Sequence, residues 1–229
     1  MSKPRVVVNP SRTFAPHTHY QDLAGKSFEE VVKLFASRVQ AWYLDQVLCR
    51  EGGDDGFLRT TMSCVVLDLL SQYYFDLPNS QESGFRQFLR EKIPQFNQRI
   101  DPEIQSSTYR NGEWRVEPID SLDKAFWHGF RCGIIHNGMI LEYGRVSTSR
   151  IAPEIIQLRE REDKNGTEVA VNPILLLERV NQLFQDYIRQ LLSPSETELR
   201  KKFAAKFERD FGVALTSGKP EAVQVAPPS

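Results

Sequence analysis

The chain has 229 residues and a mass of 26.4 kDa, a length that favours one large domain over two. Hydrophobic residues make up 40% of it and charged residues 26%, which excludes a disordered or collagen-like protein. Its 29 Lys and Arg against 30 Asp and Glu give a formal net charge of -1. This balance excludes a protein that coats nucleic acid by bulk charge, so any RNA or DNA contact must be local.

The cysteine pattern and the lack of long apolar runs predict a cytoplasmic protein. Cys49, Cys64 and Cys132 are an odd number without a CxxC pair, which is typical of reduced thiols in the cytosol. No apolar run approaches the ~18 residues of a membrane span, and the apolar stretch at residues 6–8 is too short for a signal peptide.

Prolines and composition divide the chain into three parts. Residues 1–26 carry Pro4, Pro10 and Pro16 and predict an irregular lead-in with a short strand at residues 5–8. A helical domain is expected over residues 27–212. Residues 213–229 are small and proline-rich and predict a disordered tail.

The first two helices are predicted from capping signals and apolar periodicity. Ser27 and Glu30 form a capping box that opens a helix running toward Gly52. An aspartate at 54 or 55 opens a second helix that ends before Pro78. Because the connection is short, the two helices should pack as an antiparallel pair.

The apolar pattern weakens between residues 79 and 118. It predicts a short helix near residues 85–92, followed by a mobile surface segment rich in turn formers, including Asn111 and Gly112. A third helix is expected from Leu122 to about Asn137, ended by Gly138 in the left-handed conformation.

The remaining elements are a hairpin and two helices. Residues 154–162 and 167–171 predict a β-hairpin inside a 138–172 insertion. Asn172 then caps a strongly amphipathic helix with a proline at its first position. Ser195 and Glu198 form a capping box for a last, charged helix that ends at Gly212. The fold class is therefore mainly α, a helical bundle with a small β-hairpin insertion.

The third predicted helix carries the residues that can do chemistry. On an ideal helix Leu122 and Phe126 face the bundle, whereas Trp127, Arg131 and Ile135 lie on the opposite side, which the helix's own core does not cover. Such a surface favours a partner. Arg131 and His136 are splayed by about 140° and ~7.5 Å on one straight helix, so we expect a two-fold dimer to bring two such pairs together.

An arginine and a histidine supply a defined chemistry. A guanidinium can bind a phosphate and stabilise the extra charge of a pentavalent transition state. An imidazole can give or take a proton near neutral pH. Together they suffice, without a metal or cofactor, to cleave RNA by driving the 2′-hydroxyl onto the adjacent phosphate. No Asp, Glu and His cluster in the sequence has metal-ligand spacing.

Arg131, four further residues and His136, late in a helix of a predicted bundle, resemble the R-X(4–6)-H signature of HEPN domains. The match covers roughly residues 27–137 and 173–192. The resemblance implies a metal-independent ribonuclease whose Arg131 and His136 meet those of a second protomer in a composite cleft. A toxin or antiviral role, and a protein partner that neutralises or activates the enzyme, would follow from the family.

On this hypothesis His128 and Asn137 contact the RNA substrate, and Trp127 and Ile135 form the dimer interface. The position after the arginine is often Asn, Asp or His in active members and is Cys132 here. An alternative is therefore a non-catalytic module that binds RNA, a nucleotide or a protein through the same groove. A third reading is a structural subunit.

The structural reading gives these residues ordinary roles. His136 then interacts with the helix dipole, Arg131 is a surface or interfacial cation, and His128 belongs to the core. Asp68 falls within an apolar helical run, where a buried carboxylate needs a cationic partner, and Arg131 is one candidate.

Overall fold

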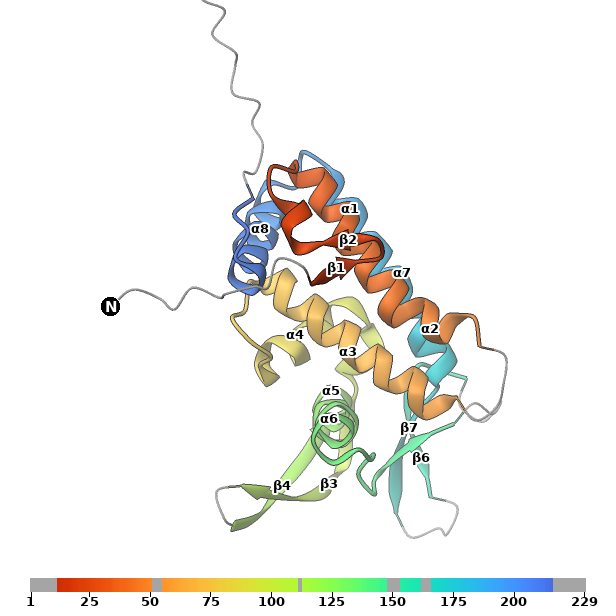
Figure 1. Ribbon diagram of the computed structural model, residues 1–229. Helices are drawn as coiled ribbons and strands as arrows, with labels where there is room; N and C mark the ends of the chain where they lie inside the picture. The colour runs from red at the N-terminus through yellow and green to blue at the C-terminus, as the bar shows by residue number, and fades with distance from the viewer. Residues whose placement is uncertain (1–11, 51–54, 111–112, 148–152, 162–165, 216–229) are drawn as a thin grey trace, which may run out of the picture.

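The computed structural model describes residues 12–50, 55–110, 113–147, 153–161 and 166–215. Within these ranges the chain is mainly helical and carries three small sheets (Figure 1). The predicted mainly α class is confirmed. A bundle with a single hairpin insertion is wrong, because strands also form near the N-terminus and between the fourth and fifth α-helices.

The first helical run extends from Phe28 to Leu48 as α1 (Phe28–Val39), the π-helical η2 (Gln40–Leu44) and α2 (Asp45–Leu48). Its capping box forms as predicted: Glu30 N donates to Ser27 Oγ at 3.2 Å, and Ser27 N donates to Glu30 Oε2 at 2.8 Å. The second predicted helix is α3 (Gly56–Phe75), which ends at Asp76 in the left-handed conformation.

The long helix α7 (Pro173–Leu192) forms the centre of the bundle. Its apolar stripe is buried, and both α1 and α3 pack against it. Asn172 Oδ1 accepts from Ile174 N at 3.1 Å and from Leu175 N at 3.2 Å, so the predicted cap is confirmed. The last helix, α8 (Thr197–Phe211), lacks its predicted capping box, because Ser195 Oγ instead hydrogen-bonds Ser193 Oγ at 2.8 Å.

The prediction that residues 1–26 form an irregular lead-in is wrong for residues 12–26, the part that the structure describes. Strands β1 (Thr13–Ala15) and β2 (Thr18–His19) pair, and the 3-10 turn η1 (Tyr20–Leu23) follows. Phe14 is fully buried, with ring centroids 5.7 Å from Phe207 and 5.2 Å from Phe211. These contacts hold the segment on the bundle. The strand predicted at residues 5–8 lies outside the described residues.

A long hairpin replaces the mobile segment predicted within residues 79–118. After α4 (Glu82–Lys92), which was predicted, and the turn η3 (Pro94–Asn97), strands β3 (Arg99–Arg110) and β4 (Glu113–Ser121) pair antiparallel. Figure 1 shows the hairpin projecting from the helices. Many of its described side chains are exposed, which explains why no apolar alternation predicted the strands.

The 138–172 insertion is a three-stranded sheet. Strands β6 (Ile156–Glu160) and β7 (Thr167–Val171) form the predicted antiparallel hairpin, and β5 (Gly144–Val146) adds a parallel strand to β7. The loop of this hairpin at residues 162–165, like the tail from 216, lies outside the described residues. The helical run that begins at Leu122 lies between this sheet and the β3–β4 hairpin (Figure 1).

Replacing Asn172 by alanine should destabilise the fold. The Asn172→Ala change removes two hydrogen bonds to the first turn of α7, so we expect the free energy of unfolding to fall by about 1 kcal/mol. Urea unfolding measures it. The matched control is Ser195→Ala, whose hydroxyl caps no helix and whose removal should change stability by less than about 0.5 kcal/mol. Equal losses in both variants would contradict the assignment.

Candidate functional site

The helix predicted over residues 122–137 is present but is not uniformly α-helical. It consists of α5 (Leu122–Ala125), the π-helical η4 (Phe126–Cys132) and α6 (Gly133–Asn137). Within it the Gly133 N–H donates to His128 O, five residues earlier. The run ends at Gly138, which has a φ of 67°, as predicted. Wider turns of this kind are frequent at functional sites and change which side chains share a face.

Two glycines let the following loop lie against this helix. Leu141 N donates to Gly129 O at 3.0 Å, and Met139 N donates to Gly133 O at 3.2 Å. A Cβ on Gly129 would lie 2.7 Å from the Tyr143 ring, and one on Gly133 would lie 2.6 Å from Met139 O. Any larger residue would push the loop away. The glycines therefore fix the position of the helix end that carries His136.

The expectation that Trp127 and Arg131 lie on an uncovered face is wrong. Their relative exposures are 7% and 9%, and the Trp127 ring lies 5.1 Å from the ring of Phe85 in α4. The ideal helical spacing does not hold in the π-helical segment, and α4 covers this side. Ile135 is 45% exposed. Of the two residues predicted for a dimer interface, only Ile135 lies at the surface of the subunit.

The guanidinium of Arg131 is held by residues of its own subunit. Its Nη2 donates to Asp68 Oδ2 at 2.8 Å and to Ser80 Oγ at 2.9 Å, and Ser80 Oγ donates to Asp68 Oδ1 at 2.7 Å. The guanidinium also lies 4.7 Å from the centroid of the Trp127 ring, a cation–π distance. The pairing of Asp68 with Arg131 considered from the sequence is thus confirmed.

The surroundings keep this arginine charged. Burial lowers the pKa of Arg131, but the hydrogen bond and the negative charge of Asp68 outweigh burial and raise it overall. Its Nε is buried without a hydrogen-bond partner among the described residues. Burial also raises the pKa of the nearby Cys64 thiol, which disfavours the thiolate form.

His136 is exposed, and its Nε2 lies 3.4 Å from Arg131 Nη1. The expectation that a single helix splays the two groups too far apart is wrong, because the long arginine side chain reaches along the helix toward the imidazole. The pair combines a fixed cation with a proton-transferring group at the surface. Such an arrangement can bind an anion and exchange a proton with it.

The two residues predicted to contact substrate lie in different environments. His128 is only 4% exposed, and its Nε2 lies 3.2 Å from Glu82 Oε1 and 4.0 Å from Glu117 Oε2, without a well-aligned hydrogen bond. Its burial under α4 and β4 is incompatible with direct contact at the surface. Asn137, by contrast, is exposed at the last position of α6, next to His136.

Sequence reasoning missed the ionic network that joins α4 to α5. Asp123 is buried and accepts from Arg86 Nε at 2.8 Å and from Arg90 Nη1 at 2.5 Å. Arg86 also pairs with Glu82 at 3.0 Å. A spacing of four between Glu82, Arg86 and Arg90 indicates a charged helical stripe, but nothing local to it points to Asp123.

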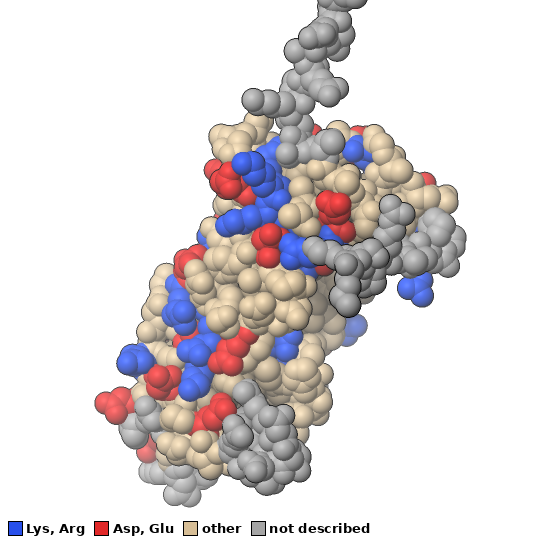
Figure 2. Space-filling model, turned by 90° about the vertical axis from the view of Figure 1, so that its left-hand side faces the viewer, with Lys and Arg blue, Asp and Glu red and all other residues tan. Residues whose placement is uncertain are grey.

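The surface has no extended field of one sign on the face in Figure 2, where basic and acidic side chains are interspersed. No group of three or more His, Cys, Asp or Glu among the described residues is placed to hold a metal ion. No helix of the described chain has the length and apolar character needed to cross a membrane.

Comparison with known proteins adds no assignment. No protein-family model, curated protein or solved structure matches this chain. The function is therefore argued from the geometry of the site.

Removing Asp68 alone should lower the free energy of unfolding more than removing both Asp68 and Arg131. Asp68→Ala leaves a buried guanidinium without its carboxylate, so we expect the free energy of unfolding to fall by about 3 kcal/mol. The double variant Asp68→Ala, Arg131→Met leaves no unpaired buried charge at this site and should lose less stability. Denaturant unfolding compares the two. A single variant that is at least as stable as the double variant would contradict this account.

The contact between Glu82 and His128 should make the free energy of unfolding depend on pH in the acid range. The neighbouring His128, opposed by burial and aided by Arg86, lowers the pKa of Glu82 from its ordinary 4.5 to about 2. The ionised form therefore stabilises the fold above about pH 4.5, and this contribution is lost as the pH falls toward 2. The stability advantage of wild type over Glu82→Gln should shrink over that range in urea unfolding. A constant difference would refute the assignment.

Proposed function

We propose that this chain is a HEPN-like, metal-independent endoribonuclease that acts as a homodimer, with Arg131 and His136 as its catalytic residues. The observation that carries the proposal is the 3.4 Å approach of Arg131 Nη1 to His136 Nε2 at the exposed end of a helix. A fixed cation beside a solvent-exposed imidazole is the combination that cleavage through the 2′-hydroxyl requires.

The reaction follows from the chemistry of the two groups. One imidazole takes the proton of the 2′-hydroxyl, whose oxygen attacks the adjacent phosphorus. The bond from phosphorus to the 5′-oxygen breaks, and the His136 of the second copy gives that oxygen a proton. The products are a 2′,3′-cyclic phosphate and a 5′-hydroxyl. Arg131 binds the phosphate and stabilises the charge of the pentavalent state.

The hydrogen bonds of Arg131 support this division of roles. Nη2 is committed to Asp68 and Ser80, which fix the plane of the guanidinium. Nη1 is directed toward His136 and donates to Cys132 Sγ at 4.0 Å, a long contact that a phosphate placed beside the imidazole would replace. Asp68 and Ser80 are thus positioning residues.

Exposed apolar side chains support a second copy at this end of the molecule. Ile135 is 45% exposed and Met139 is 57% exposed, one on each side of His136 in the chain. Two copies related by a two-fold axis would cover both side chains and bring two Arg131–His136 pairs into one cleft. Asn137 would then face RNA from the rim. A toxin or antiviral role, restrained or triggered by a protein partner, would follow from the family.

One observation favours a second candidate, a non-catalytic module that binds RNA, a nucleotide or a protein. The Asp68 carboxylate already compensates the charge of Arg131 within the subunit, which weakens the attraction of the guanidinium for a phosphate. In that case the site formed by Arg131 and His136 binds its ligand without cleaving it.

Cleavage of RNA in EDTA separates the candidates. Wild-type protein should yield cyclic phosphate ends, and His136→Gln, which replaces an exposed imidazole with a polar group that does not titrate, should lower the rate by about 100-fold or more. His17→Gln, which removes an exposed imidazole between β1 and β2 in the N-terminal ribbon formed by these two strands, is the matched control and should retain activity. Sedimentation of the same samples shows whether the active species is a dimer.

Each other outcome has a defined meaning. Retention of RNA without cleavage would favour the non-catalytic module. Cleavage that survives in His136→Gln would exclude His136 as the proton-transfer group and overturn the proposal.

A further inference from the structure

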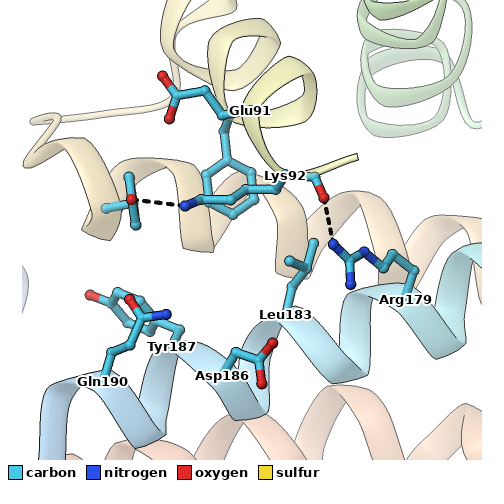
Figure 3. A pocket seen from close by; sticks show the side chains of 9 residues that line it. Glu91, Lys92, Arg179, Leu183, Asp186, Tyr187 and Gln190 are labelled. Atoms are coloured by element: carbon cyan, nitrogen blue, oxygen red, sulfur yellow. Dashed lines mark hydrogen bonds between the residues drawn. The ribbon is translucent and has the colours of Figure 1, made fainter. Parts of the chain in front are cut away.

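A second site lies away from Arg131, in a cavity of about 240 Å³ between α3, α4 and α7 (Figure 3). Its walls combine aromatic, aliphatic and cationic side chains: Tyr74, Phe88, Lys92, Arg179, Leu183 and Tyr187. None of the residues that hold Arg131 lines it. The cavity is therefore a separate place from the proposed ribonuclease site.

The hydroxyl of Tyr187 has no hydrogen-bond partner among the described residues, although the residue is only 4% exposed. A buried hydroxyl without a partner costs free energy, and native proteins rarely leave one without a reason. Burial raises the pKa of Tyr187 well above its ordinary value, so the group keeps its proton and is a hydrogen-bond donor. The Tyr187 ring lines the cavity, whereas its hydroxyl has almost no accessible surface and is enclosed in the wall.

Lys92 places a positive charge at the wall of the cavity. Its Nζ donates to Tyr74 Oη at 2.8 Å and lies 4.1 Å from the centroid of the Tyr74 ring. No carboxylate in the described part of the chain forms an ion pair with this ammonium. Because Tyr74 Oη accepts the bond from Lys92, its own proton is available to a ligand.

The two acidic residues of the cavity wall, Glu91 and Asp186, each contact another side chain. In Figure 3 the Glu91 side chain points away from the cavity, and its Oε1 accepts from Gln87 Nε2 at 2.8 Å. Asp186 forms an ion pair with Arg189. The end of the cavity near Lys92 therefore presents donors and a positive charge, and the exposed amide of Gln190 lies at its edge.

The cavity also has apolar walls. Phe88 and Leu183 line it, and the Arg179 guanidinium is engaged by the Lys92 carbonyl at 2.7 Å and by Gln182 at 2.9 Å. Apolar walls with a few convergent polar groups are the usual composition of a small-molecule site.

We propose that this cavity binds a small organic oxyanion. Its carboxylate or phosphate head would accept hydrogen bonds from Lys92 and Tyr74, and its aromatic or aliphatic body would lie against Phe88 and Leu183. An occupant would bridge α4 and α7. The same donors serve both kinds of head group, so the choice of probe distinguishes them.

Titration calorimetry of the full chain tests the proposal with phenyl phosphate and benzoate, and with benzyl alcohol as the neutral comparison. We expect saturable one-to-one binding of at least one of the two anions, and binding of the alcohol weaker by about tenfold or more. Lys92→Met should remove the preference for the anion. Failure of both anions to bind would overturn the proposal.

Tyr74→Phe removes the hydroxyl to which Lys92 donates and keeps the ring. We expect it to weaken binding of the anion by about tenfold, because a hydrogen bond to a charged group is lost. Tyr43→Phe, which changes a tyrosine outside the cavity, is the matched control and should bind as wild type does. Unchanged affinity in Tyr74→Phe would also overturn the proposal. Neither result depends on ribonuclease activity.

Discussion

The ion pair between Asp68 and Arg131 is the interaction on which the arrangement of the site depends. It joins the middle of α3 to the π-helical part of the 122–137 helix, and Ser80 bridges both partners. A charge this deeply covered requires a counter-charge and hydrogen bonds, or its burial would destabilise the fold. The pair therefore fixes which way the arginine fork points. Only because Nη2 is committed to Asp68 does Nη1 lie beside His136.

The elements with strong local signals were predictable from the sequence. The Ser27 capping box, the Asn172 cap, the apolar stripe of α7 and the left-handed Gly138 each depend on residues a few positions apart, and each forms as predicted. The β3–β4 hairpin was missed even though the turn formers Asn111 and Gly112 lie between its two strands in the sequence. Its strands project from the core, so they lack the alternation of apolar and polar residues that predicts a half-buried strand. The N-terminal ribbon was missed because Phe14 is anchored by α8, from the other end of the chain.

For the site, the sequence identified the helix and the two side chains that approach each other but not their surroundings. The ideal spacing of an α-helix placed Trp127 and Arg131 at the surface. The π-helical segment and the covering helix α4 place both inside. His128 is likewise enclosed, facing carboxylates from α4 and β4. Periodicity describes one helix at a time, so it cannot report which neighbour covers a face. The ion pair with Asp68 was anticipated as one option because a carboxylate in an apolar run needs a cation.

Helix α4 has a mechanical consequence that follows from its two sets of contacts. Its side chains Arg86 and Arg90 donate to Asp123, at the start of the helix that carries Arg131, while Lys92 at its last position forms part of the cavity wall. One short helix therefore carries both sets of contacts, and an occupant of the cavity that shifted its last turn would also shift the side chains that hold Asp123. If that occupant changed the affinity of the protein for RNA, RNA would change the affinity for the occupant by the same factor.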